Sequence, residues 1–339
     1  MPKPIIAAHF QIAPWEQRYI QNALPKAKHV FVPGRLSPRH LPKIKHINVL
    51  SNFINSPADK NIIDGLPKLG LITTRSTGFD HIDMAAAKAR KITVCNVPFY
   101  GENTVAEHTL AMLLTLSRRI IECVERTRRS NFSPKGLTGF DLAGKTIGIV
   151  GLGHIGKHVV IMAKGFGMQV ITFDVKQDKA FAKKHGVRFV SLNTLLKTSD
   201  VISLHAPYNK HTHHLINAKN LKLIKKGAIL LNTSRGGLVE TAALYTALES
   251  GRLGGVGLDV LEEENALGED LAHLEHNGKN HELLTALISS RLTDHPRAIV
   301  TPHNAFNTRE ALERILETTV KNMTAWTRGK PVNVVVVKK

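Results

Sequence analysis

Three glycines in the middle of the chain have the spacing of a dinucleotide-binding turn. Gly151, Gly153 and Gly156 form a G-x-G-x-x-G motif that follows the apolar run 146–150 and precedes a helical pattern. In that context the first glycine permits a tight turn, the second lets the backbone approach a pyrophosphate, and the third lets the helix pack closely on the strand. The free N–H groups and the dipole at the start of the helix would hold the phosphates.

An acidic residue stands where such a site needs one. Asp174 ends the next predicted strand, 18 residues after Gly156. A carboxylate there can accept hydrogen bonds from both hydroxyls of an adenosine ribose and would repel a 2′-phosphate, which favours NAD over NADP. The alternative is a structural turn followed by a solvated aspartate. Because glycines, strand, helix and acid coincide, the sequence predicts an NAD site.

Three further segments place charged side chains just after apolar runs. They carry Arg235, Glu264 and His303, and they comprise 232–237, 258–264 and 301–306. Open α/β sheets bind ligands at the carboxyl ends of their strands, so the three side chains are candidates for one site. The alternatives are an arginine in a structural ion pair, a solvated acidic run at 262–264, and a histidine that caps a helix or lies in the core.

The elements that must position these residues alternate between short apolar runs and helical patterns, which is typical of parallel α/β sheets. Strands are predicted at 4–8, 29–32, 47–50, 71–74, 92–96, 146–150, 169–173, 187–190, 201–204, 228–232, 255–258 and 299–301. Helices are predicted at 83–90, 155–166, 179–185, 192–198, 218–224, 241–249 and 308–327. The glycine motif begins near residue 151, so a complete α/β unit precedes the nucleotide-binding unit.

Two longer stretches complete the prediction. A long helix is expected to begin at Thr104, because Thr104 and Glu107 fit a capping box, and to continue through Ile121 toward the basic run 126–129. The following stretch 130–139 contains proline and glycine and is predicted as a loop. The polar, histidine-rich stretch 262–296 is predicted as a loop or insertion that forms an extra helix or a lid near the site.

Composition limits the class of protein. The chain has 339 residues, which suggests two domains, and 42% of them are hydrophobic, enough for sizeable cores. The net charge of +19 favours anionic partners without naming one. Two cysteines, Cys95 and Cys123, cannot form a disulfide framework, which indicates a reducing, cytoplasmic setting. Neither a signal peptide nor a run of roughly 18 apolar residues is recognised, and no nucleic-acid motif accompanies the basic residues.

The order of these motifs resembles the D-isomer-specific 2-hydroxyacid dehydrogenase family. The resemblance covers essentially the whole chain, and the segments 75–83, 96–100, 105–108 and 203–207 also carry it. Within the family the chain is most similar to the D-lactate dehydrogenases. The resemblance implies two doubly wound α/β domains: a Rossmann NAD-binding domain at 101–303, and a flavodoxin-like catalytic (substrate) domain formed by 1–100 and 304–339. It also implies a homodimer, with the helix after Thr104 at its interface.

The resemblance implies roles for the charged side chains. Arg235 would hold the carboxylate and 2-oxo group of the substrate by planar, charge-assisted hydrogen bonds. His303 would be the general acid–base that protonates the substrate oxygen as hydride leaves NADH. Glu264, five residues after Asp259 as in the family pattern, would pair with His303 and favour its protonated form.

Further substrate and cofactor contacts are implied in the same way. The backbone N–H groups of Thr77 and Gly78 would bind the carboxylate, and Tyr100 and Phe306 would surround a small 2-oxo acid, although aromatic residues more often lie in a core. Asp259 would organise Arg235 or the nicotinamide end. The implied cofactor-binding residues are Val105, Gly151, Gly153, His154, Ile155, Gly156, Asp174, His205, Pro207, Thr212, Thr233, Ser234 and Asp259.

No metal site is expected. The neighbouring histidines His211, His213 and His214 lack a cysteine or acid at ligand spacing, so they are predicted to be exposed. The same exposure is predicted for His273, His276, His281 and His295.

The implied reaction is the reversible reduction of pyruvate by NADH to D-lactate. Larger 2-oxo acids, hydroxypyruvate or glyoxylate would use the same residues and remain alternatives. A binding protein that senses NAD, like the corepressors of the family, is a third possibility because the net charge of +19 could suit a nucleic acid. The sequence gives it less support, since all three catalytic residue types are present.

Overall fold

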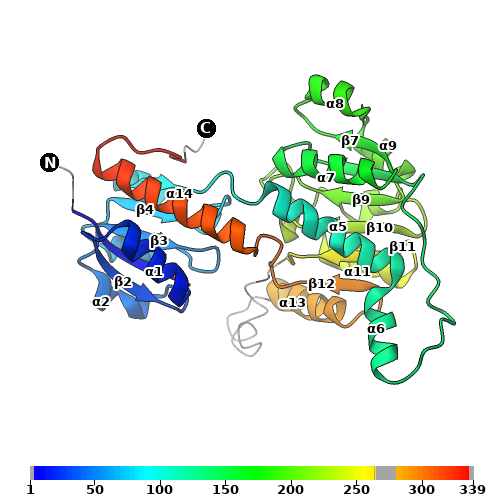
Figure 1. Cartoon of the computed structure of the whole chain (residues 1–339), viewed down its shortest axis with the longest axis horizontal. Coiled ribbons are helices and arrows are strands. Elements are labelled where there is room, and N and C mark those ends of the chain that lie inside the picture. Colours follow the sequence, from blue (N-terminus) through cyan, green and yellow to red (C-terminus); the bar gives the residue numbers. More distant parts are fainter. Residues whose placement is uncertain (1–3, 263, 265–279, 336–339) are drawn as a thin grey trace. The chain divides into compact units, whose positions relative to one another are not determined.

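The computed structural model describes residues 4–262, 264 and 280–335. Contacts within the chain divide it into two units, Met1–Tyr100 with Thr308–Lys339, and Gly101–Asn307. Each unit contains one parallel sheet, coloured blue to cyan in the first unit and green to orange in the second (Figure 1). In the part of the chain that is described, no helix is long and apolar enough to cross a membrane.

The first unit is built on a five-stranded sheet. Its strands are β1 (Ile6–Phe10), β2 (Lys28–Val32), β3 (Val49–Asn52), β4 (Leu71–Thr74) and β5 (Thr93–Cys95). They pair in parallel in the order β2-β1-β3-β4-β5, which is the flavodoxin-like order. The direction of winding reverses between β1 and β3, so ligands are expected beyond the carboxyl ends of these strands.

Helices cover both faces of this sheet, so every residue of β3 and β4 and four of the five residues of β1 are buried. The helices are α1 (Pro14–Ala23), α2 (Leu41–Ile44), α3 (Lys60–Asp64), α4 (Met84–Ala89) and α14 (Arg309–Thr327), with a 3₁₀ turn at Pro38–His40. Successive residues of β4 serve opposite cores: Ile72 packs with α2, α3 and α4, whereas Leu71 packs with Trp326 of α14. The carboxyl-terminal helix is therefore part of the first unit.

The second unit contains a seven-stranded sheet. Its strands are β6 (Thr146–Val150), β7 (Gln169–Phe173), β8 (Arg188–Phe189), β9 (Val201–Leu204), β10 (Ala228–Asn232), β11 (Leu253–Leu258) and β12 (Ala298–Val300). The order is β12-β11-β10-β9-β6-β7-β8, and all neighbours are parallel. Counted from β6, this is the Rossmann order 3-2-1-4-5-6 with one more strand at the edge.

Two layers of helices enclose the second sheet. The helices of this unit are α5 (Glu102–Arg118), α6 (Ile120–Arg128), α7 (His154–Gly165), α8 (Lys179–His185), α9 (Leu192–Thr198), α10 (Ala218–Leu221), α11 (Thr241–Glu249) and α13 (Asn280–Thr293), with a 3₁₀ turn at Gly236–Leu238. Of these, α6 has no buried residue and belongs to neither core. One core joins α5, α7 and the sheet, and α5 and α7 lie side by side in Figure 1. The opposite core joins the sheet to α9, α10, α11 and α13. Hydrophobic cores cover both faces of the sheet, which leaves the carboxyl ends of the strands for ligand binding.

The predicted alternation of strands and helices is confirmed. The bounds of β4, β6, β7, β9, β10, α8, α9 and α11 agree with the prediction, and the ends of most other predicted elements shift by one or two residues. The stretch 262–296, predicted as a loop or insertion with an extra helix or lid, contains α13. His273 and His276 lie outside the described residues, and so does the side chain of His281.

The prediction of one long capped helix is wrong. The helix α5 begins at Glu102 with Gly101 as its N-cap, so Thr104 lies inside the first turn and does not cap it. The helix then breaks at Arg119, whose φ of +52° is left-handed, and α6 begins one residue later. The basic run therefore ends α6. An apolar pattern with helical spacing continues across the break, which is why the sequence did not reveal it.

Two histidines in the first unit are held in a form that resists protonation. His9 on β1 is fully buried, its Nε2 lies 3.0 Å from Nδ1 of His29, and its ring stacks on Phe31. Burial and the nearby charges of Arg75 and His29 lower the pKa of His9 well below its usual value. Burial also lowers the pKa of His29. Both imidazoles are therefore harder to protonate in the folded unit than in the unfolded chain.

This burial predicts a loss of stability in weak acid. The unfolded chain binds protons below a pKa of about 6.5 that the folded unit rejects, so its unfolding free energy falls as pH drops through that value. His9→Phe is expected to flatten this dependence by up to about 1.4 kcal/mol per pH unit below pH 6.5. The only two tryptophans, Trp15 and Trp326, belong to this unit, so their fluorescence during urea unfolding measures the effect. Equal slopes for His9→Phe and a control at the exposed His46, His46→Phe, would contradict it.

Candidate active site

The glycine motif forms the turn between β6 and α7 at the point where the second sheet reverses direction. Gly151 has φ of +98°, and a Cβ there would lie 2.7 Å from the carbonyl carbon of His205 at the end of β9. A Cβ on Gly156 would lie 2.2 Å from the carbonyl oxygen of Gly151. Both positions therefore require glycine for reasons within the protein.

Gly153 is a glycine that the protein itself does not require. It is the N-cap of α7 with φ of −75°, which any residue can adopt, and a Cβ built on it would meet nothing within 4 Å. The open space faces the start of α7, whose first residues are His154 and Ile155. A helix N-terminus with free N–H groups and no side chain in front of it fits a bound pyrophosphate. The residues present thus fit the dinucleotide that the motif predicts.

Asp174 lies beside this turn at the end of β7. Its Oδ2 accepts a 2.6 Å hydrogen bond from the backbone N–H of Leu152, and its Oδ1 accepts one from Lys176 at 2.8 Å. These bonds fix the carboxylate next to the glycine turn and leave it half-buried. The position is the one a ribose-binding carboxylate needs.

His205 closes the other side of the turn. Its Nε2 lies 2.8 Å from Oγ of Ser203, and burial lowers the pKa of the ring to about 4. The ring is therefore neutral at physiological pH. Among the described residues its buried Nδ1 has no hydrogen-bond partner. Two residues on, the carbonyl oxygen of Pro207 accepts a 2.7 Å bond from Oγ1 of Thr212, which shapes the loop after β9.

The segment after β10 carries Arg235. Thr233 is buried and its Oγ1 lies 2.9 Å from Oγ1 of Thr109 on α5, one turn beyond Val105. Asn232 holds the turn with both side-chain atoms, accepting from the N–H of Ser234 at 3.1 Å and donating to the carbonyl oxygen of Arg235 at 2.9 Å. These bonds set the backbone from which the half-buried guanidinium of Arg235 extends.

Asp259 holds the loop that carries His303. The residue is 1% exposed and follows β11. Its carboxylate accepts hydrogen bonds from the backbone N–H groups of Asn304 at 2.7 Å and Ala305 at 2.9 Å. Its carbonyl oxygen accepts from the N–H of His303 at 2.9 Å. The buried carboxylate thus organises the turn after β12, a role that the sequence did not indicate.

His303 and Glu264 form a pair. Nδ1 of His303 lies 2.8 Å from Oε1 of Glu264, and the two side chains are 21% and 31% exposed. His303 has φ of +52°, a left-handed conformation that costs a non-glycine residue about 1–3 kcal/mol and persists only where neighbours enforce it. Here the bonds of Asp259 enforce it. In the part of the chain that is described, Nε2 of His303 makes no hydrogen bond, so it is the ring nitrogen that is available to a ligand.

The remaining candidate residues lie in less constrained positions. Thr77, in the loop after β4, is exposed, and its Oγ1 donates to the carbonyl oxygen of Val97 at 2.9 Å. Gly78 follows, and its carbonyl oxygen accepts from Oγ of Ser76. Tyr100 and Phe306 are each half-buried and therefore not core residues. The carbonyl oxygen of Tyr100 accepts a 2.6 Å bond from Nε of Arg314.

Several histidine predictions need correction. His211 and His213 are exposed as predicted, but His214 is half-buried, and its Nε2 lies 2.6 Å from Oε1 of Glu262. His295 is 9% exposed and lies 3.2 Å from Glu249. Glu262 is 10% exposed, so this member of the acidic run is not solvated. Their partners are distant in sequence, and no local pattern could have paired them.

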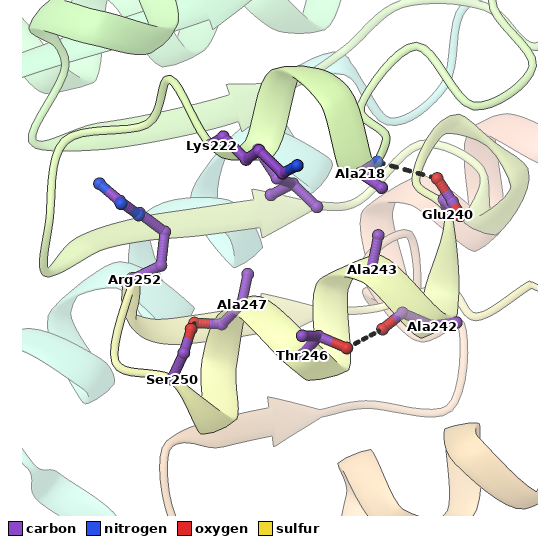
Figure 2. Close-up of a pocket in the computed structure, with 10 residues that line it drawn as sticks. Ala218, Lys222, Glu240, Ala242, Ala243, Thr246, Ala247, Ser250 and Arg252 are labelled. Atoms are coloured by element: carbon purple, nitrogen blue, oxygen red, sulfur yellow. Dashed lines mark hydrogen bonds between the residues drawn. The ribbon is translucent and has the colours of Figure 1, made fainter.

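A separate surface pocket of about 440 Å³ lies between α10 and α11. Figure 2 shows its wall of small residues from α11, including Ala243, Thr246 and Ala247, with Lys222 and Arg252 on one side. Glu240 closes one end by accepting a 2.9 Å bond from the N–H of Ala218. None of the candidate catalytic residues lines this pocket. Within the described residues, no group of three or more metal-ligating side chains is present.

Comparison with known proteins decides the family. The profile of the D-isomer specific 2-hydroxyacid dehydrogenase NAD-binding domain matches residues 110–305, more than half of the chain. The chain belongs to the D-isomer specific 2-hydroxyacid dehydrogenase family. A 2-hydroxyacid dehydrogenase homolog of Zymomonas mobilis is 40% identical over 89% of this chain and 90% of that protein. A glyoxylate reductase of Thermococcus litoralis is 36% identical over 87% and 85% of the two chains.

The solved structures agree. The structure of a D-lactate dehydrogenase from Aquifex aeolicus, complexed with NAD and lactic acid, matches with a TM-score of 0.87 at 36% identity, and the match covers 98% of this chain and 100% of that one. The expected two-part α/β fold, with a Rossmann domain and a substrate domain, is confirmed. As a D-2-hydroxyacid dehydrogenase, the enzyme is an NAD-dependent oxidoreductase.

Proposed function

We propose that this D-2-hydroxyacid dehydrogenase reduces a small 2-oxo acid, with pyruvate as the preferred substrate and D-lactate as the product. The observation that carries the proposal is the 2.8 Å contact between His303 and Glu264 at the strand edge that also carries Arg235 and the glycine turn. A 2-oxo acid offers a carboxylate for a guanidinium and a carbonyl oxygen for a proton donor, which are the groups that this edge holds. Relatives named for lactate support this choice.

The chemistry divides between the cofactor and the chain. NADH, when bound, supplies the hydride that adds to the carbonyl carbon of the substrate. His303 donates a proton from Nε2 to the carbonyl oxygen, while Glu264 holds Nδ1 and stabilises the imidazolium before the transfer. Arg235 binds the carboxylate and polarises the carbonyl group. The sum is pyruvate, NADH and one proton giving D-lactate and NAD⁺, and oxidation reverses each step.

We assign the remaining residues as follows. The N–H groups of Thr77 and Gly78 bind the substrate carboxylate, and Tyr100 and Phe306 limit the size of its side chain. The glycine turn, with His154 and Ile155, binds the cofactor phosphates, and Asp174 binds the ribose. The other proposed cofactor-binding residues are Val105, His205, Pro207, Thr212, Thr233, Ser234 and Asp259. The unit formed by 1–100 and 304–339 is the substrate domain in this assignment, and 101–303 is the NAD-binding domain.

The proposal is tested by NADH oxidation, followed by absorbance, with pyruvate and a panel of glyoxylate, hydroxypyruvate, phenylpyruvate and 2-oxoisocaproate. We expect pyruvate to have the highest kcat/KM and chiral analysis to identify D-lactate. A preference for glyoxylate, which the name of the Thermococcus litoralis relative suggests as the second candidate, would keep the mechanism and replace the substrate. Tight NADH binding without turnover of any acid would favour the sensing protein instead.

We further propose a homodimer in the cytoplasm. The helix α6 presents Ile120, Ile121 and Val124 with 46%, 42% and 40% of their surface exposed, and Phe132 beyond it is 80% exposed. Apolar residues gathered in this way are typical of a surface that a second subunit covers. The two cysteines are free, which suits a reducing compartment. Sedimentation analysis should give twice the chain mass.

A further inference from the structure

The second unit contains another histidine–glutamate pair beside the proposed catalytic one. Glu262, two residues before Glu264, places Oε1 2.6 Å from Nε2 of His214. Its other oxygen, Oε2, accepts hydrogen bonds from Oγ1 of Thr241 at 2.7 Å and from the N–H of Thr241 at 3.2 Å. A carboxylate that is 10% exposed thus binds two separate segments, the loop after β9 and the start of α11.

The charge of Glu262 is stabilised where it lies. Burial raises the pKa of its carboxyl group, but the hydrogen bonds from His214 and Thr241 outweigh burial and hold the pKa below its usual value. Thr241 is the first residue of α11, whose N-terminal dipole also favours a negative charge. At neutral pH the contact is therefore charge-assisted, and such bonds are short and strong.

His214 is itself fixed from several sides. Its φ of +48° is left-handed, as in His303, and its backbone N–H donates to the carbonyl oxygen of Gly237 at 2.8 Å. The ring stacks on His213 with centroids 3.8 Å apart, and Nδ1 of His213 lies 3.1 Å from the hydroxyl of Tyr208. A left-handed backbone conformation is unfavourable for histidine and persists only where neighbouring contacts hold it. The hydrogen bond and ring contacts of His214 therefore hold its side chain in a fixed position for Glu262.

The glutamate segment, Leu261 and Glu262, lies with its backbone directly against Gly236. A Cβ on Gly236 would lie 2.0 Å from the carbonyl carbon of Leu261 and 2.2 Å from the nitrogen of Glu262. Gly236 directly follows Arg235, so the arginine turn and the glutamate segment are packed backbone against backbone. With the side chain of Glu262 bonded on the other side, the segment is held on two sides.

We propose that Glu262 is a positioning residue that fixes Glu264 against His303. The inference rests on the proposed function, in which the pair of His303 and Glu264 carries the proton. Glu264 follows Glu262 by two residues, so a loosened segment would move its carboxylate away from Nδ1 of His303. A misplacement of about 1 Å can lower catalysis by about a hundredfold. His214 and Thr241, the partners of the Glu262 carboxylate, are not among the residues assigned to NADH, so this role predicts unchanged NADH binding.

The test is a double-mutant cycle on kcat for oxo-acid reduction. Glu262→Ala is expected to lower kcat about tenfold while the Kd for NADH, measured by fluorescence, and the KM for the acid change less than twofold. In a Glu264→Gln background, the same substitution should have no further effect on kcat, because the carboxylate that Glu262 positions against His303 is gone. His214→Asn, in which asparagine tolerates the left-handed backbone, should lower kcat severalfold and be equally non-additive.

The matched control is Glu240→Ala. Glu240 is the N-cap of the same helix, and its carboxylate accepts a hydrogen bond from the N–H of Ala218 (Figure 2). Its replacement tests whether general damage to the start of α11 lowers activity, and it should leave kcat within twofold. A kcat loss from Glu262→Ala that is additive with Glu264→Gln, or no loss, would overturn the positioning role alone. An unchanged kcat in Glu264→Gln itself would overturn the proposed catalytic pair, and the inference with it.

Discussion

Replacing His303 with glutamine is expected to lower kcat for oxo-acid reduction by at least about a hundredfold, because a positioned general acid contributes about 10²–10⁴-fold. Glutamine fills similar space and can still bond Glu264, but it cannot release a proton to the substrate oxygen. The loss should fall on kcat, with the Kd for NADH unchanged, because the side chain acts on the reacting oxygen. Steady-state kinetics and a fluorescence titration with NADH measure the two quantities.

The control for His303→Gln is His295→Gln. His295 is also mostly buried and also lies beside a glutamate, Glu249, but it belongs to a different part of the second unit. It should retain kcat within twofold. If both variants retain near-wild-type turnover, His303 is not the proton donor and the mechanism is wrong.

Replacing Arg235 with alanine is expected to reduce kcat/KM by more than about a hundredfold. A charge-assisted, planar pair of hydrogen bonds to a carboxylate is lost, and removing one such electrostatic contact costs about 10²–10³-fold. Arg235→Lys keeps the positive charge but lacks the paired N–H donors of the planar guanidinium, so it should recover only part of the activity. Added guanidinium chloride at millimolar concentration should partly rescue the alanine variant, since it supplies the missing group.

The control for Arg235→Ala is a variant that loses a different arginine and should not respond to added guanidinium. Arg252→Ala removes an exposed arginine from the rim of the pocket in Figure 2 and should leave kcat/KM within twofold. Guanidinium should not stimulate this variant, the wild type or His303→Gln. Equal stimulation of all of them, or an unaffected Arg235→Ala enzyme, would rule out substrate binding by Arg235.

Local patterns in the sequence predicted much of the fold. Parallel strands buried on both faces are short apolar runs, so β4, β6, β7, β9 and β10 were predicted with their bounds. The glycine spacing could be interpreted because the turn at Gly151 and the packing at Gly156 exclude any side chain. These constraints act within a few residues, and one sequence is enough to state them.

Elements without a local signal were mispredicted. The helix breaks at Arg119 because this one residue is left-handed, although the helical pattern of apolar residues continues past it. Thr104 was predicted as the N-cap in place of Gly101 because a capping box begins with serine or threonine. Glycine at an N-cap leaves no side-chain signature, so the boundary is visible only in the backbone.

The sequence by itself determined the residue types of the site: a glycine turn, an acid for a ribose, and an arginine, a glutamate and a histidine, each after a strand. Only the tertiary structure decided how they are held. The carboxylate of Asp259 binds a loop some 45 residues away, and Glu262, in a run of acids that looks solvated, binds His214 from 48 residues away. Such contacts depend on which strands become neighbours in the sheet, and pairing between strands far apart in sequence leaves no periodic trace along the chain.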